Sequence, residues 1–330
     1  MSPANALART FLLGTAVALL AAWLAPGIGA TGGALRSEQI AWYGVVFIFF
    51  VQGVQLSTAH FRESLFAWRL HLYIQVASLI AFPLLTFLLL VVAGGAVPPD
   101  VRLGFLFLAI LPTTISSAAV LVNAAGGDLP SAIFNSALSN ILAVFTVPLL
   151  CGWMLAAQSP IDIPAGPLLW KVAQLLLLPL VAGQVLRPWL AGFAARHKAR
   201  LAQVNNLIIF FMVYAAFCDS LGIGAGILDL STLLWSLGGS LVLLLASTWL
   251  AWRCSVRFPR AQRITALLCA SQKTLASGVP LAGAIFAAAA GAQLPAPGAF
   301  LLPLICYHPL QLLLGSWLAG RLAGGGQPER

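Results

Sequence analysis

The sequence predicts an all-α polytopic membrane protein with ten transmembrane helices, arranged as two inverted five-helix repeats. Of its 330 residues, 61% are hydrophobic and 8% are charged, and its mean hydropathy is +0.98. A chain of this composition must keep nearly all of its side chains away from water. A spanning helix needs about 20 apolar residues, and lipid offers no partner for backbone polar groups, so the long apolar blocks are predicted to be helices rather than strands.

Ten apolar blocks follow one another along the chain, and the short connections between them hold most of the charge. The first block, with Arg9 ahead of an apolar run and small residues around Gly29, also has the layout of a signal peptide. Its removal would leave nine spans and no symmetry, so we expect it to be a retained helix. The blocks cover residues 8–26, 39–58, 69–94, 101–125, 129–155, 167–188, 203–224, 231–252, 262–290 and 297–321.

The distribution of Lys and Arg predicts the orientation. With a cytoplasmic N-terminus, the inner side carries most of the cations, which favours a multi-pass protein of the inner (plasma) membrane with both termini cytoplasmic. The net charge of +9 then faces anionic membrane lipid, and no basic patch of the nucleic-acid-binding kind is present. The inner cations are Arg9, Arg62, Arg69, Arg187, Arg196, Lys198, Arg200, Arg253, Arg257, Arg260, Arg263, Arg321 and Arg330. The outer ones are Arg36, Arg102 and Lys171.

The blocks divide into two halves of five. Residues 1–157 are predicted to form the first repeat, residues 158–322 the second, and residues 323–330 a flexible cytoplasmic tail. Because five is an odd number, the second repeat enters the membrane upside down. Inverted repeats of this kind are typical of secondary transporters.

Corresponding blocks in the two halves are interrupted. The fourth block breaks at Pro112, and the ninth contains "CASQKTLASGVPLAG". A break facing lipid would leave backbone groups unpaired at several kcal/mol each, so both are expected to face protein or a water-filled cavity. Half-helix ends and freed carbonyls there favour an ion or anion site near mid-membrane. The alternative is a proline kink patched by Ser and Thr side chains.

Polar side chains at the two breaks are the candidates for binding a cation or a substrate. Lys273 is the most informative, because a buried amine costs several kcal/mol unless it pairs, reaches the interface or loses its proton. Helix 5 adds a polar stripe that can line the same site or simply join helices. The candidates at the breaks are Thr113, Thr114, Ser116, Ser117, Ser271, Gln272, Lys273 and Thr274. The stripe contains Ser131, Asn135, Ser136, Ser139 and Asn140.

Two more ionisable groups, Asp219 and His308, are candidates for lining a cavity. The sequence context favours the other interpretation, in which Asp219 is a solvated carboxylate at the outer end of its helix and His308 is a packing residue in the last helix. His71 is assigned to a cytoplasmic loop and is given no role.

The chain offers little for catalysis or for a tightly held cofactor. It has eight Asp and Glu residues in all, and no P-loop, HExxH or GxSxG motif. Its five cysteines form no CxxC pair and are predicted to be small core residues. We therefore expect that the protein is not an enzyme and holds no cofactor, with sodium as a candidate coupling ion.

Three segments carry a family resemblance. "LPTTISSAAVLVNAAGGDLPSAIFNSALSN", "CASQKTLASGVPLAG" and "YHPLQLLLGSWLAG" resemble the bile acid:sodium symporter superfamily, specifically its SBF-like branch, and the resemblance covers nearly the whole chain. It implies that helices 1, 2, 6 and 7 form a panel, that helices 3–5 and 8–10 form a core, and that broken helices 4 and 9 cross in that core. Typical members bring organic anions into the cell together with sodium, so the resemblance implies a small anionic solute as partner.

Matched residue by residue, the resemblance implies sodium ligands on helices 3, 4, 5 and 9. Ser131 and Asn135 match ligands on the fifth helix, and Gln75 matches a glutamine of the second sodium site. Two departures stand out: Ala118 replaces a side-chain ligand, and the ninth helix has Lys273 but no glutamate. Hydroxyl, amide and carbonyl oxygens can still hold sodium, although an adjacent ammonium opposes it. The sodium candidates are Ser117, Ser131, Asn135 and Gln272.

The sequence thus predicts a secondary active transporter of an organic anion or other small solute, coupled to sodium, that alternates access around the helix 4/9 crossing. The missing glutamate suggests that the Lys273 ammonium occupies or borders the space of one sodium, paired with helix-end carbonyls and with Gln272, Asn135 or Gln75. Coupling would then involve at most one sodium, or a proton from Lys273. The alternatives are a proton-coupled transporter or exchanger, and a non-transporting membrane regulator with the same fold.

Overall fold

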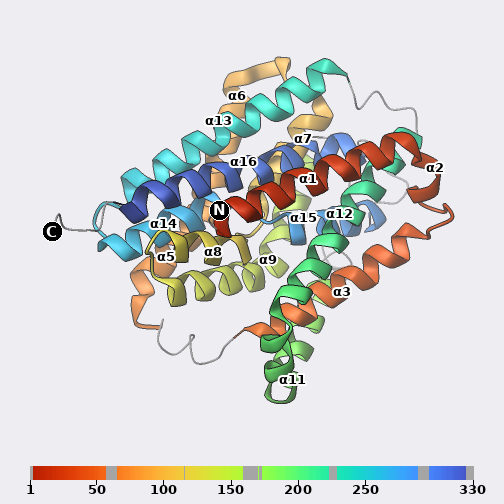
Figure 1. The fold of residues 1–330 in the computed structure, drawn as a ribbon. Coiled ribbons are helices and arrows are strands. Elements are labelled where there is room, and N and C mark those ends of the chain that lie inside the picture. The colour runs from red at the N-terminus through yellow and green to blue at the C-terminus, as the bar shows by residue number, and fades with distance from the viewer. Residues whose placement is uncertain are drawn as a thin grey trace.

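The computed structural model describes residues 3–56, 65–114, 116–158, 170, 173–222, 229–288 and 297–324, and every regular element among them is a helix (Figure 1). Seven helices in this part of the chain are long and apolar enough to cross a membrane, as a polytopic membrane protein requires. These are Ser37–Gln55, Trp68–Ala96, Leu129–Val147, Ala173–Arg196, Lys198–Leu221, Leu230–Cys254 and Pro297–Ala323.

The helices follow the apolar blocks of the sequence. In chain order they are α1 (Pro3–Leu24), α2 (Pro26–Gly29), α3 (Ser37–Gln55), α5 (Trp68–Val76), α6 (Phe82–Ala93), α7 (Pro99–Ile110), α8 (Ser116–Ala124), α9 (Leu129–Gln158), α11 (Leu178–Arg196), α12 (Lys198–Gly222), α13 (Leu230–Cys254), α14 (Arg260–Ser271), α15 (Leu275–Ala288) and α16 (Pro297–Gly324). A π-helical turn, Ala77–Ala81, joins α5 to α6, and another, Ala173–Leu177, precedes α11.

The fourth and ninth blocks each form two half-helices. α7 ends before Leu111, whose backbone is extended (φ −67°, ψ 148°), as is common for a residue that precedes proline. α14 ends before Gln272, which is also extended (φ −100°, ψ 141°). Pro112 has no N–H to continue the first helix, whereas the second break contains no proline. The second interruption therefore depends on contacts with other helices.

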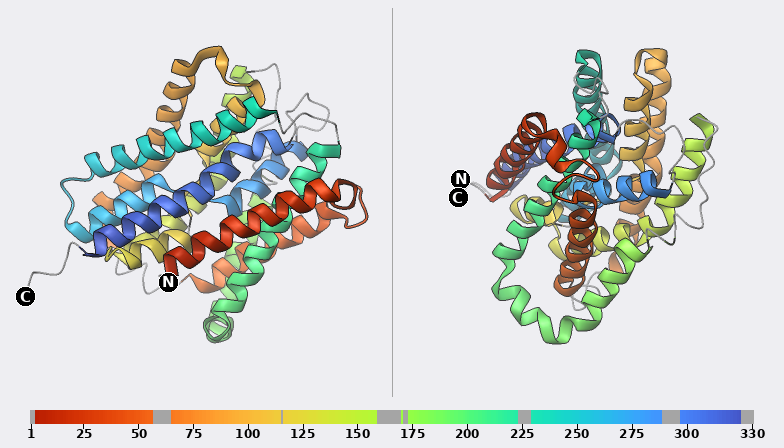
Figure 2. Two further views of the ribbon diagram at one scale, coloured as in Figure 1. Left: turned by 45° about the horizontal axis from the view of Figure 1, so that its top comes forward. Right: turned by 90° about the vertical axis from the view of Figure 1, so that its right-hand side faces the viewer.

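Some boundaries differ from the sequence-based ones. The sixth helix was predicted to end at Pro188, but α11 continues through that proline to Arg196, and α12 begins two residues later at Lys198. Proline removes one hydrogen bond from a helix without necessarily ending it. The two helices meet at one edge of the molecule and diverge from there (Figure 2). The predicted repeat boundary at 157/158 falls at the end of α9, and residues 325–330 of the predicted tail lie outside the described residues.

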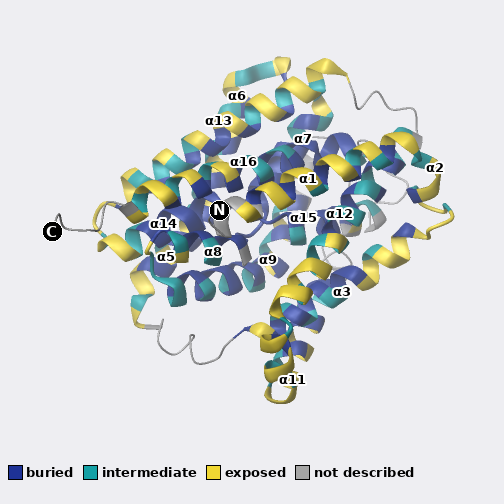
Figure 3. Cartoon of the chain, in the orientation of Figure 1, coloured by how far each residue is buried: buried dark blue, intermediate teal, exposed yellow. Residues whose placement is uncertain are grey.

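Burial separates central helices from peripheral ones. In the most apolar stretch of α16, 78% of the residues are buried inside the protein, against 22% in the span formed by α5 and α6. Large apolar side chains such as Val17 on α1, Val92 on α6 and Trp249 on α13 are exposed, and Figure 3 shows these exposed faces directed outward. In a chain this apolar, such faces are those that meet lipid.

Helices α3 and α11 pack backbone against backbone at two glycines. A Cβ added at Gly53 would overlap the carbonyl oxygen of Leu180, and one added at Gly183 would overlap that of Phe50. Small residues at such crossings let membrane helices approach closely where the hydrophobic effect does not drive association.

Substituting Gly183 with Val should destabilise the protein, because the new side chain can fit only if α3 and α11 separate. We expect a loss of about 1–3 kcal/mol, typical of overpacking, seen as a lower thermal midpoint of the purified protein. Gly238→Val on α13 is the matched control, since a Cβ there meets nothing within 4 Å. Equal midpoints for the two variants would contradict the close packing of α3 on α11.

Candidate functional site

The two breaks meet in the interior of the molecule. The Thr274 N–H, in the second break, donates to the Pro112 carbonyl in the first at 3.1 Å. The stripe on α9 completes the first break: Ser139 Oγ accepts from the Thr113 N–H at 3.2 Å, and Asn140 Nδ2 donates to the Thr113 carbonyl at 3.0 Å. Each break thus supplies or receives hydrogen bonds that a continuous helix would have made within itself.

Lys273 is fully buried, and its ammonium lies among backbone carbonyls. Nζ donates to the carbonyls of Ser78 at 2.8 Å, Ala109 at 2.9 Å and Leu111 at 2.8 Å. It also lies 4.3 Å from the centroid of the Phe82 ring. Among the described residues, no Asp or Glu forms a salt bridge with Lys273.

The carbonyls around Lys273 are electronegative because of where they lie. Ala109 and Leu111 are at the C-terminal end of α7, where carbonyls lack intrahelical partners and the helix dipole is negative. Ser78 lies in the π-helical turn between α5 and α6, a geometry that alters the regular pairing of carbonyls. The predicted pairing with helix-end carbonyls is therefore present. The side chains of Gln272, Asn135 and Gln75 are not among the hydrogen-bond partners of Nζ in the described structure.

Helix α16 holds the second break from the other side. Gln311 Oε1 accepts from the Lys273 N–H, and Gln311 Nε2 donates to the Lys273 carbonyl, both at 2.7 Å. Tyr307 donates from its hydroxyl to the Ser271 carbonyl at 2.6 Å. Sequence reasoning gave neither residue a role, although both belong to the "YHPLQ" segment and are spaced i, i+4 on one helix face.

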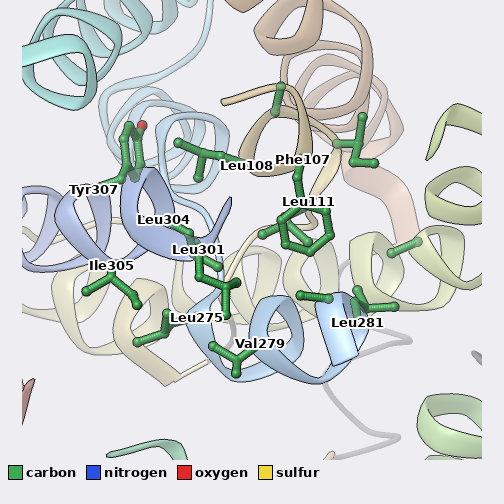
Figure 4. Close-up of a cluster of buried hydrophobic side chains, with 14 of the residues drawn as sticks. Phe107, Leu108, Leu111, Leu275, Val279, Leu281, Leu301, Leu304, Ile305 and Tyr307 are labelled. Atoms are coloured by element: carbon green, nitrogen blue, oxygen red, sulfur yellow. The ribbon is translucent and has the colours of Figure 1, made fainter. Parts of the chain in front are cut away.

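Apolar side chains surround the meeting point. Figure 4 shows Leu111, Leu275, Val279 and Leu304 packed together beside the breaks, with Tyr307 at one side of the cluster. The first four are at most 6% exposed. Such packing lowers the local dielectric constant, which strengthens the hydrogen bonds of Lys273 and raises the cost of losing any of them.

The three residues matched to sodium ligands on helices 3 and 5 lie together. Gln75 Nε2 donates to the Asn135 carbonyl at 3.1 Å and to its Oδ1 at 3.2 Å, and Asn135 Nδ2 donates to the Ser131 carbonyl. Ser131 Oγ donates to Asp128 at 2.7 Å. His71 was assigned to a loop, but it is buried in α5 with its Nδ1 2.8 Å from Asn135 Nδ2. Asp128 and His71 are additional members that the sequence did not single out.

The other candidates do not join this group. Ser117 Oγ donates to Thr114 Oγ1 at 2.8 Å, and Ser271 Oγ donates to a carbonyl one turn back in its own helix. Gln272 is 1% exposed, and neither of its amide atoms has a partner in the described structure. The backbone of Ser116 begins α8, but its side chain lies outside the described part of the chain. The candidates thus form several small clusters rather than one coordination shell.

A cavity of about 460 Å³ opens between α3, α12, α15 and α16, near one end of the helices. Asp219 lines it, and its two carboxylate oxygens accept from the backbone N–H and the hydroxyl of Thr31. Glu38 is its second acidic residue, and its lining contains no Lys or Arg. Val279 and Pro280 of α15 bring the cavity within two turns of Lys273. His308 lines neither this cavity nor the second one described below; it packs edge-to-face on Phe11 of α1.

Comparison with known proteins identifies relatives over the full length of the chain. Residues 9–324 match the family model described as SBF-like CPA transporter family. An uncharacterized protein of Pseudomonas aeruginosa is 33% identical over 328 residues, covering 98% of this chain and 95% of the relative. Sodium/bile acid cotransporter 7 of Danio rerio is 30% identical over 325 residues, covering 94% and 95%, and that of Rattus norvegicus is 30% identical over 328 residues, covering 95% and 94%.

Replacing Gln311 with Leu should destabilise the second break, because the buried Lys273 N–H loses its partner and the Lys273 carbonyl keeps only a long contact with His308 Nδ1 at 3.4 Å. We expect a loss of about 1–3 kcal/mol for each unpaired group, measured as a lower thermal midpoint. Gln203→Leu on an exposed face of α12 is the control for the change in polarity. If Gln311→Leu melts at the wild-type midpoint, α16 does not hold the break.

Proposed function

The chain is a membrane transporter, not an enzyme; it belongs to the SBF-like CPA transporter family within the bile acid:sodium symporter superfamily, and we propose that it is a secondary active symporter of a small organic solute. One observation carries this proposal: two broken helices pair with each other around a buried ammonium, and a cavity ends close to that point. Such breaks at mid-membrane are where secondary transporters bind substrate and ions.

We propose ten membrane-spanning helices in two inverted repeats. α7 with α8 takes the fourth position and α14 with α15 the ninth, and the hydrogen bond between Thr274 and Pro112 supports their crossing. In this arrangement α1, α3, α11 and α12 are the panel, and the other long helices are the core. The cavity is lined by α3 and α12 on one side and by α15 and α16 on the other, so panel and core can alternate access to it by moving against each other.

Lys273 is proposed to act as a fixed cation. Its ammonium neutralises the carbonyl dipoles at the end of α7, a task that a bound ion performs in transporters with similar breaks. The side chains of Gln75 and Asn135 would then hold at most one coupling sodium. Gln75 Oε1 supports a sodium site here, because it is buried and has no partner in the described structure. An amide oxygen of this kind is a suitable ligand for a hard cation.

The proposed solute has a mainly apolar body, because apolar side chains such as Met212, Phe286 and Leu301 line much of the cavity. The family resemblance favours an organic anion. The carboxylates of Asp219 and Glu38 instead favour a neutral or cationic solute, since they raise the cost of bringing in a negative group. Uptake into proteoliposomes should therefore be compared for anionic, neutral and cationic amphipathic compounds.

Two other functions, proton-coupled transport and regulation without transport, predict different experimental results. In a proton-coupled transporter or exchanger, Lys273 would itself release and rebind the coupling proton, and a pH gradient would drive uptake without sodium. A non-transporting regulator would keep its function after Lys273→Ala and Asn135→Ala, whereas a transporter would not.

Orientation can be tested with a C-terminal reporter. Both termini should be cytoplasmic in the inner membrane, because most of the Lys and Arg residues are predicted to lie on that side. A cytoplasmic reporter fused after Arg330 should be active, and a periplasmic one should not. The opposite pattern would overturn the even number of spans.

Lys273→Met should abolish solute uptake and lower stability. Methionine has a side chain of similar length, but it leaves the carbonyls of Ser78, Ala109 and Leu111 without a hydrogen-bond donor. Each unpaired buried carbonyl costs about 1–3 kcal/mol, so the thermal midpoint should fall clearly. Added sodium should restore part of that loss in the variant, because an ion can then take the place of the ammonium.

Lys273→Glu is the second test variant. It should gain sodium-dependent stabilisation, because it places a carboxylate near the breaks, as in the typical family members that have a glutamate on the ninth helix. Gln203→Leu again serves as the control for handling and assay. Uptake by the wild type with a Hill coefficient for sodium near two, retained in Lys273→Met, would show that Lys273 does not replace an ion.

A further inference from the structure

A second cavity lies at the surface between α1 and α16, where the start of α1 runs beside the end of α16 in antiparallel fashion (Figures 1 and 2). Its volume is about 510 Å³. It lies where α1 begins and α16 ends, and it shares no residue with the cavity that contains Asp219. Its lining is formed by Ala8, Arg9, Leu12, Leu313, Ser316, Trp317, Gly320 and Arg321.

Two arginines face this cavity from different helices. Arg9 is near the start of α1, and Arg321 is in the last turn of α16. The lining contains no Asp or Glu, and among the described residues neither arginine forms a salt bridge. Two guanidinium groups beside one cavity repel each other unless an anion lies between them, and their planar donors suit a phosphate.

The remaining wall has both a polar and an apolar part. Ser316 is 8% exposed, and its hydroxyl is buried without a hydrogen-bond partner in the described structure. Leu12 and Leu313 are exposed apolar side chains next to it, and Trp317 is 56% exposed with Arg321 above its ring at 5.3 Å. Tryptophan beside arginine at a helix end is typical of the membrane interface, where headgroups and acyl chains meet.

We propose that this cavity binds the phosphate of an acidic phospholipid. Arg9 and Arg321 hold the phosphate, Ser316 donates its free hydroxyl, and Leu12 and Leu313 contact the upper part of an acyl chain. A lipid fits better than free phosphate because the apolar wall continues into the lipid-facing side of α1, where Leu13 and Val17 are exposed. The headgroup would tie the start of α1 to the end of α16.

The test uses full-length purified protein in detergent, stripped of native lipid and then given phosphatidylglycerol or phosphatidylcholine. Native mass spectrometry counts the bound lipids, and the thermal midpoint reports stabilisation. Phosphatidylglycerol should be retained and should raise the midpoint, and phosphatidylcholine should do so at least tenfold less effectively. Arg9→Gln with Arg321→Gln should weaken phosphatidylglycerol retention at least tenfold.

Matched variants separate this site from general basic charge. Arg196→Gln with Arg257→Gln removes the same charge from exposed positions outside the cavity and should bind phosphatidylglycerol like the wild type. Ser316→Leu keeps both arginines but fills the cavity, so it should also weaken retention. This variant keeps the test valid if the double arginine variant does not fold.

Three results would overturn the proposal. The first is equal retention of phosphatidylglycerol by wild type and by Arg9→Gln/Arg321→Gln or Ser316→Leu. The second is equal stabilisation by phosphatidylcholine, whose choline cation compensates its phosphate; this would mean that the cavity does not recognise the net negative charge of the headgroup. The third is full stabilisation by inorganic phosphate alone, which would identify a soluble anion rather than a lipid as the ligand.

Discussion

The hydrogen bonds of the Lys273 ammonium to the end of α7 are the interaction on which the centre of this structure depends. A membrane protein can interrupt a spanning helix only if the freed backbone groups find partners inside the protein. Here the carbonyls of Ala109 and Leu111 find an amine from the second break, and the Pro112 carbonyl finds the N–H of Thr274. Each break therefore satisfies the other, and neither would be stable in lipid alone.

Close packing keeps this arrangement in register. α16 is the most buried of the long helices, and it positions Lys273 through the side chain of Gln311 rather than through its own backbone. At the periphery, α3 and α11 meet at Gly53 and Gly183 without side chains between them. The centre is therefore held by directional hydrogen bonds, and the α3–α11 contact is held by close backbone packing. This combination suits a protein in which one group of helices moves against another.

The helices of this protein could be predicted from its sequence better than the contacts between them. Helix content and the position of the first break follow from apolar block length and from Pro112, which are local properties. The second break was located by the run of polar residues from Ser271 to Thr274. Burial of Lys273 also followed, because a lysine in mid-block has few other solutions. Pairing with helix-end carbonyls was predicted, but the individual partners were not, because a backbone carbonyl such as that of Ser78 leaves no signature in the sequence. His71 was missed for a related reason, since a histidine close to a block end looks the same whether it faces water or Asn135.

A tethered cation changes what ion coupling can mean in such a transporter. A coupling ion shifts the balance between two conformations only if its affinity differs between them. An ammonium that cannot leave stabilises the breaks in every state in which it keeps its carbonyl partners, so by itself it couples nothing. Differential binding must then come from groups whose partners can be exchanged. The cluster of Gln75, Asn135 and Ser131 meets that requirement, because the hydrogen bonds from Gln75 to Asn135 join α5 to α9. Gln75 also has a buried amide oxygen without a partner in the described structure.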